Sequence, residues 1–364
     1  MQIADIISLI EEVAPISLQE EYDNAGMQIG DKNQEATGAL LCIDVTEDIL
    51  DEAIQKGFNL IISHHPLLFK GLKNITGKNY IERIVIKAIK NDIAIYAAHT
   101  NLDNAFGGVN FKIAEKLKLE NVKILSPIKD LFLKLVVFVP TSAADKVREA
   151  MLCAGAGKIG NYDMCSYNMN GFGTFRAGEG ANPYCGEVGA IHKEEETRIE
   201  VILPKYNRDK VINAMLNVHP YQEPAYDIIE LQNINSYAGS GVVGELAEPL
   251  DAKYFLEMVK DAFNVAAIKY STFTGNKIKR VALCGGSGAF LINDAIRAKA
   301  DVFITGEIGY HHFFTAEKKI LLVEAGHYET EQYTKDIFCD IITKKFPNFA
   351  VQYANVGSNP INYL

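Results

Sequence analysis

Short apolar runs that alternate with helical patterns constrain the fold of this 364-residue chain more than any other feature. In the first third, they predict strands at 39–46, 58–63 and 93–98, with helices at 47–56 and 80–91. A strand–helix–strand rhythm is typical of a parallel sheet whose faces are covered by helices. We therefore expect an α/β fold.

The last third repeats this rhythm. Strands are predicted at 281–284, 301–304 and 320–325, and a helix is predicted at 328–345. The loop Gly285–Gly288 follows the first of these strands, and a helix start there can cradle an anion with its backbone N–H groups. Neither GxxxxGK[ST] nor GxGxxG is present, however, so we favour a tight turn.

Polar side chains suited to metals follow the predicted strands in both outer segments. In open α/β sheets, ligands gather outside the carboxyl ends of the strands. A histidine pair alone is more often an exposed loop feature, but here six of the eight histidines lie at or just beyond strand ends. They are His64, His65, His99, His311, His312 and His327.

Glu331 adds a carboxylate to this set. It lies four residues after His327, so the two side chains share one face if a helix begins near His327.

The middle of the chain has a different pattern. The predicted elements are a strand at 133–140, a helix at 142–154, a glycine-rich stretch, a strand at 198–204, a helix at 207–217 and a strand at 225–231. This order fits an antiparallel sheet with two helices on one face. We assign residues 126–236 to an inserted α+β domain, with a return linker from Asn233 to Gly241.

Charge and composition exclude several classes of protein. The net charge of −10 disfavours a nucleic-acid interface, because phosphate binding needs clustered Lys and Arg. We see neither an export signal nor an apolar run of membrane-spanning length. The six cysteines include no CxxC pair, which indicates reduced thiols in a cytoplasmic protein and makes them poor candidates for a zinc cage.

Several motifs of the outer segments follow one another in a characteristic order: Glu21-Tyr22-Asp23-Asn24-Ala25-Gly26, Ser63-His64-His65-Pro66, His99-Thr100-Asn101-Leu102-Asp103, Thr305-Gly306-Glu307 and Gly326-His327-Tyr328-Glu329-Thr330-Glu331. In these residues the chain resembles the Nif-three-like family, also catalogued as the GTP cyclohydrolase I type 2 homologues. The middle segment resembles the CutA/PII-like insert of the longer bacterial members, through Gly171-Phe172-Gly173-Thr174-Phe175 and His219-Pro220-Tyr221-Gln222-Glu223-Pro224-Ala225-Tyr226-Asp227.

The resemblance implies a discontinuous core, residues 1–125 and 237–364, with mostly parallel sheets and two divalent cations per subunit. The insert at 126–236 would then be a ferredoxin-like domain of the CutA/PII type. By resemblance, His65 and Asp103 bind one ion, His64 and His327 bind the other, and Glu331 bridges both. Three imidazoles and two carboxylates suit zinc, manganese or iron(II).

Further residues are expected to orient the ligands or to move protons: His99, Glu307, His311 and His312. Each could equally be an ordinary polar loop residue. The pair Asp23-Asn24 is similarly open between a turn and a contact near the metals.

Two functions remain open. The first is a metal-dependent hydrolase that acts on GTP, another nucleotide or a cyclic amide through a metal-bridging hydroxide. The second is a metal-binding regulatory or metal-handling protein without turnover. The resemblance also implies a homo-oligomer, most simply a hexameric ring. We expect a small-molecule substrate and, from the acidic charge and the short apolar runs, no nucleic-acid or membrane partner.

Overall fold

The computed structural model describes residues 1–233 and 237–362, which form two compact units. Unit 1 contains Met1–Pro127 and Ser236–Leu364, and unit 2 contains Ile128–Asn235. Part of the expected linker, residues 234–236, and with it the expected boundary after 236, lies outside the described residues. No described helix is both long and apolar enough to cross a membrane.

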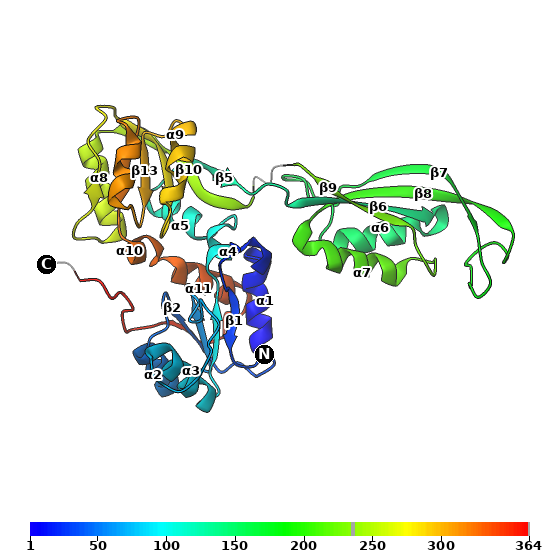
Figure 1. The fold of residues 1–364 in the computed structure, drawn as a ribbon, viewed down its shortest axis with the longest axis horizontal. Helices are drawn as coiled ribbons and strands as arrows, with labels where there is room; N and C mark the ends of the chain where they lie inside the picture. Colours follow the sequence, from blue (N-terminus) through cyan, green and yellow to red (C-terminus); the bar gives the residue numbers. More distant parts are fainter. Residues whose placement is uncertain (234–236, 363–364) are drawn as a thin grey trace. The chain divides into compact units, whose positions relative to one another are not determined.

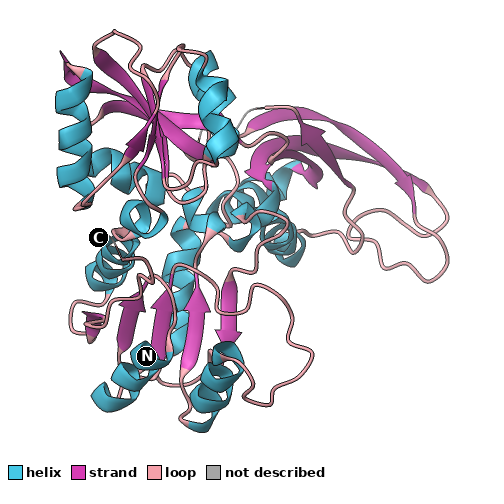
Figure 2. Cartoon of the chain, turned by 60° about the vertical axis from the view of Figure 1, so that its left-hand side comes forward, coloured by secondary structure: helices cyan, strands magenta, loops and turns pink. Residues whose placement is uncertain are grey.

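The first sheet of unit 1 is built from the N-terminal segment and one late strand. Its three central strands β2, β3 and β4 are parallel, as the apolar runs predicted, whereas β1 runs in the opposite direction at one edge (Figure 2). Across the sheet, the strands are β1 (Gly26–Ile29), β4 (Ala94–Ala97), β3 (Leu60–Ser63), β2 (Ala39–Cys42) and β15 (Val351–Tyr353).

Helices cover both faces of this sheet. On one face, α2 (Glu47–Lys56) and α3 (Tyr80–Lys90) pack their apolar residues against alternate residues of the strands, including Leu40, Ile61 and Ile95. On the other face, the buried Tyr96 reaches α1 (Ile3–Val13), where its hydroxyl donates to Glu11 at 3.4 Å.

The second sheet of unit 1 is mixed, which differs from the mostly parallel sheet that was expected. The pairs β12–β13 and β13–β14 are parallel, but β11, β10 and β5 pair antiparallel. Because β10 and β5 enter the sheet next to β12, the parallel rhythm covers only its middle. The strands are β11 (Lys269–Tyr270), β14 (Leu321–Glu324), β13 (Val302–Thr305), β12 (Ile278–Cys284), β10 (Gly239–Leu250) and β5 (Glu120–Pro127).

Helices also cover the second sheet, with α8 (Ala252–Phe263) and α9 (Ile292–Arg297) on opposite sides of β13 (Figure 1). The expected helix at 328–345 is divided into α10 (His327–Glu331) and α11 (Thr334–Lys345). The short helices α4 (Thr100–Asp103) and α5 (Val109–Lys116) follow β4.

The parallel strands of each sheet end in register. Cys42 pairs with Ser63, and Ser63 with Ala97; in the second sheet, Cys284 pairs with Thr305, and Thr305 with Glu324. The segments that leave these strands therefore start from a common edge, where polar side chains can meet.

Unit 2 is a four-stranded antiparallel sheet with two helices, α6 (Ala144–Cys153) and α7 (Arg208–Val218), on one face (Figure 1). Both helices contribute to the apolar core, through Val147 and Met215 among others. The strand order is β7 (Tyr167–Arg176), β8 (Ile191–Pro204), β6 (Phe132–Pro140) and β9 (Tyr226–Leu231).

We predict that Ile61→Ala lowers the free energy of unfolding of the chain by about 3 kcal/mol, because it leaves a cavity in a fully buried strand. Ile75→Ala is the matched control, because the Ile75 side chain is 52% exposed. Urea unfolding followed by circular dichroism measures both, and equal losses would contradict the buried position of β3.

Candidate metal centre

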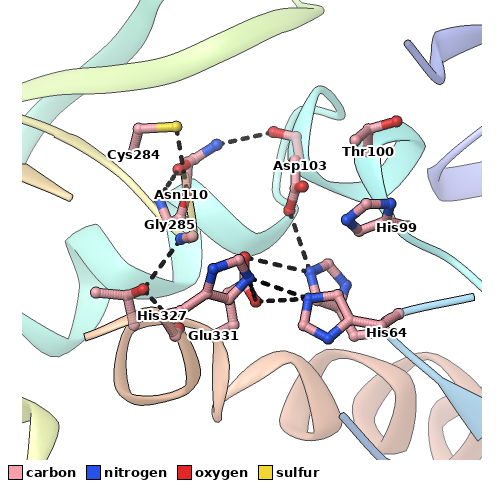
Figure 3. Close-up of polar contacts among 12 residues, drawn as sticks. His64, His99, Thr100, Asp103, Asn110, Cys284, Gly285, His327 and Glu331 are labelled. Carbon is pink, nitrogen blue, oxygen red and sulfur yellow. Dashed lines mark hydrogen bonds and ion pairs between the residues drawn. The ribbon is translucent and has the colours of Figure 1, made fainter. Parts of the chain in front are cut away.

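The expected ligands come from separate segments of unit 1 and meet in one cluster. His64 and His65 follow β3, Asp103 ends α4, and His327 and Glu331 lie one turn apart on α10. Figure 3 shows the side chains of His64, Asp103, His327 and Glu331 directed toward a common centre.

His64 is a fully buried ring with one nitrogen left free. Its Nδ1 lies 2.9 Å from the carbonyl oxygen of Ala98, and because a carbonyl only accepts, Nδ1 donates. The lone pair therefore resides on Nε2, which is 3.6 Å from Oδ1 of Asp103 and 3.6 Å from Oε1 of Glu331.

His65 and His327 are held in the same manner by carboxylates. Nδ1 of His65 donates to Asp44 at 2.7 Å, and Nδ1 of His327 donates to Glu307 at 2.9 Å. Their Nε2 atoms face each other at 3.3 Å, and they lie 3.0 and 3.2 Å from Oε2 of Glu331. Carboxylate–histidine pairs of this kind orient imidazoles toward metals.

Three buried atoms of the cluster test whether it fits metal ions. Nε2 of His64 and Oδ1 of Asp103 lack a hydrogen-bond partner among the described residues, and Oε2 of Glu331 faces the Nε2 atoms of His65 and His327. Buried polar atoms without a partner cost free energy. Because they converge and are all metal-ligating atoms, the residues present fit divalent cations.

The cluster divides into two groups of possible ligands that share Glu331: His64 and Asp103 on one side, His65 and His327 on the other. This geometry favours His64 with Asp103 and His65 with His327, whereas the pairing of His65 with Asp103 and of His64 with His327 that the resemblance implies stays a prediction. His64 and His65 are neighbours after β3, so their side chains point in different directions. The ring of His64 lies beside α4, close to Asp103.

The carboxyl groups of the cluster have pKa values that are shifted in opposite directions. Burial and the charge of Glu331 raise the pKa of Asp103. Burial alone would raise the pKa of Glu331 too, but the imidazoles of His64, His327 and His65 outweigh burial and hold it well below its usual range.

Burial lowers the pKa of His64, which favours the neutral imidazole that binds metals. Burial would lower the pKa of His65 as well, but its contacts with Asp44 and Glu331 raise the pKa to about 10. Burial would also lower the pKa of His327, but its contact with Glu331 raises the pKa to about 9. The carboxylates around these two rings therefore favour their protonated forms.

His99 lies beside the cluster, with its ring 5.3 Å from the rings of both His64 and His65. Its Nδ1 donates to Oδ1 of Asp23 at 2.8 Å. Burial alone would raise the pKa of Asp23, but hydrogen bonds from His99 and Thr100 lower it to about 2. Asp23 therefore orients His99 and does more than form a turn.

His311 and His312 do not join the cluster. They lie on the 3₁₀ helix η5 (Tyr310–Ala316) with exposed side chains, and the His311 ring packs against Tyr310 and Phe314. Their expected role in orienting the ligands or moving protons stays a prediction, and in this structure η5 exposes both side chains. Glu307, by contrast, contacts His327 directly.

Asp44 and Asn110 were missed by the sequence analysis. Asp44 follows β2 as the histidines follow β3, so its place after an apolar strand was an available signal. Asn110 has no such signal: its amide donates to the carbonyl of Asp103 and accepts from the backbone N–H of Gly285, both at 2.9 Å.

The loop Gly285–Gly288 serves as a tight turn beside the cluster. The backbone N–H groups of Gly286 and Gly288 donate to Thr330 and Thr305, so they are not free to cradle an anion. Gly286 has φ +58°, and a Cβ there would lie 2.1 Å from Oε1 of Glu331. The glycine is needed because the carboxylate occupies that space.

A cavity of about 340 Å³ opens onto the cluster. Tyr22, Phe69 and Phe290 contribute largely exposed aromatic side chains to its lining, at 72%, 48% and 67% exposure. Glu20 and Asp44 add carboxylates, and no Lys or Arg is among the described residues that line it.

The fold and the cluster define a mixed α/β protein with a candidate metal centre. The family model described as Duf34/NIF3 (NGG1p interacting factor 3) matches residues 1–360. The chain belongs to this family, which confirms the resemblance drawn from its motifs.

Individual relatives agree with this assignment. A protein named GTP cyclohydrolase 1 type 2 homolog from Halalkalibacterium halodurans is 43% identical over 84% of this chain and 82% of its own length. A protein of the same name from Bacillus subtilis is 38% identical over 99% of this chain and 98% of its own. The crystal structure of a Bacillus cereus protein related to NIF3 superposes with a TM-score of 0.87 at 39% identity, covering 100% and 99% of the two chains.

We predict that Asp44→Asn weakens divalent-cation binding by about 10- to 100-fold. The neutral amide lacks the charge with which the Asp44 carboxylate holds the His65 ring in place. Metal titration against a competing chelator measures the affinity. Asp48→Asn, an exposed change on α2, is the control. Equal affinity in both variants would contradict the orienting role of Asp44.

We predict that Gly286→Ala also weakens metal binding, because the added methyl displaces the Glu331 carboxylate. Gly71→Ala is the control, since a Cβ at Gly71 meets no atom within 4 Å. Metal content by mass spectrometry after dialysis compares the two variants, and full occupancy in Gly286→Ala would contradict the observed close approach.

Proposed function

We propose that unit 1 is a hydrolase with a centre for two divalent cations. The observation that carries the proposal is Glu331, a 2% exposed carboxylate with one oxygen toward His64 and the other toward His65 and His327. A carboxylate in this position can bridge two ions. Asp103 and His64 would complete one binding site, and His65 and His327 the other.

Zinc, manganese or iron(II) bound there would act as Lewis acids and lower the pKa of water. The chain's own residues would orient the ligands and move protons. Asp44 and Glu307 hold His65 and His327 through Nδ1 and leave each Nε2 free to bind. Asp23 holds His99 in the same way, so Nε2 of His99 can take a proton from a reacting group.

The cavity lining supports a narrower substrate class. Acidic side chains and the absence of Lys and Arg from its described lining residues disfavour a triphosphate, because phosphate sites usually supply cations. The exposed rings of Tyr22, Phe69 and Phe290 can pack against a flat ring. An uncharged cyclic amide or related heterocycle therefore fits better than GTP.

The alternative is a metal-binding regulator without turnover, in which unit 2, as a CutA/PII-like domain, responds to a ligand within a hexamer. The separate, compact fold of unit 2 supports this alternative. Light scattering of the purified chain tests the assembly, and a monomeric mass would remove the hexamer from the proposal.

Glu331→Gln tests the hydrolase. We expect metal-dependent hydrolysis of cyclic amides to fall by more than about 100-fold, since losing an orienting partner alone costs 10- to 100-fold. Glu329→Gln is the matched control, because Glu329 is another buried glutamate of α10 that accepts from Asn359 at 3.0 Å. The measurement is turnover across a panel of cyclic amides, guanosine and GTP with added zinc, manganese or iron(II).

Faster hydrolysis of GTP than of every uncharged substrate would overturn the proposed substrate class. The regulator would be supported instead if the wild type binds metal tightly, Glu331→Gln loses this binding, and the wild type turns over none of the substrates.

A further inference from the structure

A second cluster of metal-ligating side chains lies in unit 2. His192 and Glu194 are two residues apart on β8, so they project from the same face of the sheet. Cys185, in the segment between β7 and β8, reaches this face. Ligand atoms of the three side chains lie within 4.8 Å of one another, and Nε2 of His192 is 2.7 Å from Oε2 of Glu194.

The backbone around this cluster leaves room for its side chains at two glycines. Gly186 has φ +79°, and a Cβ there would lie 2.7 Å from Cβ of His192. Gly173 pairs with Glu194 on the neighbouring strand, and a Cβ there would lie 2.1 Å from Oε2 of Glu196. A larger residue at either position would push the side chains of β8 away.

Aromatic residues surround the cluster. The ring of Phe175 lies 5.4 Å from that of His192, and the hydroxyl of Tyr221 donates to Glu196 at 2.8 Å. A cavity of about 550 Å³, lined by Phe175, Tyr221 and Glu196 among others, adjoins this network. Residues from two motifs of the insert, Gly171–Phe175 and His219–Asp227, thus line this cavity. The proposed chemistry of unit 1 does not involve them.

We propose that Cys185, His192 and Glu194 bind a borderline-soft divalent cation such as Zn²⁺. Thiolate, imidazole and carboxylate are the ligand types that zinc takes in proteins. Three protein ligands leave a fourth position that faces solvent, since His192 and Glu194 have side chains 29% and 28% exposed. Binding would release the thiol proton of Cys185 to solvent.

The absence of a CxxC pair made the cysteines poor candidates for a zinc cage in the sequence. Cys185 and His192 are separated by a loop whose path the sequence does not reveal. Only the return of that loop onto β8 brings sulfur, nitrogen and oxygen together.

Cobalt(II) is the probe for this site in the full-length chain. The candidate ligands of unit 1 are nitrogen and oxygen atoms only, so a thiolate-to-cobalt absorption band in the near ultraviolet reports on a cysteine ligand. We expect the wild type to show this band, Cys185→Ser to lose it, and Glu331→Gln to retain it. Cys153→Ser, at an exposed cysteine on α6, is the matched control and should also retain it.

His192→Ala provides a second variant that keeps the thiol. We expect it to weaken the cobalt affinity measured from the band by more than about 10-fold, the lower end of the loss for an orienting residue alone. Far-ultraviolet circular dichroism without metal checks that each variant folds.

Absence of the band in the wild type, its persistence in Cys185→Ser, or unchanged affinity in His192→Ala would each overturn the proposal. These outcomes do not depend on hydrolysis. The proposed function of unit 1 is therefore tested separately, by the Glu331→Gln variant.

Discussion

A carboxylate buried among three imidazoles is the interaction on which the organisation of unit 1 depends. A carboxylate at the position of Glu331 is costly to bury unless positive charge or hydrogen-bond donors face it. His64 and His65 come from the end of the first sheet, while His327 and Glu331 follow the second. The charge therefore links the ends of both sheets, and removing it would take the facing carboxylate away from the Nε2 atoms of rings from each sheet.

Each imidazole is held through its Nδ1, so that its Nε2 is directed inward. The acceptor differs: a carbonyl for His64, and carboxylates for His65, His327 and His99. A carboxylate acceptor stabilises the charged ring more than a carbonyl does. Burial lowers the pKa of His64, whereas contacts with Asp44 and Glu331 raise the pKa of His65, and contact with Glu331, supported by Glu307, raises the pKa of His327.

The strands and their polar ends followed from periodicity, because strands buried on both faces need continuous apolar residues. The four-residue spacing of His327 and Glu331 predicted their shared face, and their atoms lie 3.2 Å apart. The sequence did not reveal that His311 is exposed, because that depends on how η5 turns after Gly309. Asp44 was missed because the predicted strand 39–46 includes it, whereas β2 ends at Cys42.

The sequence alone determined the family, the alternation of strands and helices, and the set of residues that close the strands. These depend on local spacing and on motifs that can be read along the chain. Tertiary structure decided which candidate ligands lie together, why Gly286 must lack a side chain, and that Cys185 lies close to His192. The first two depend on distances between segments far apart in sequence, and the third depends on the path of the loop before β8; all are fixed only when the sheets and loops pack.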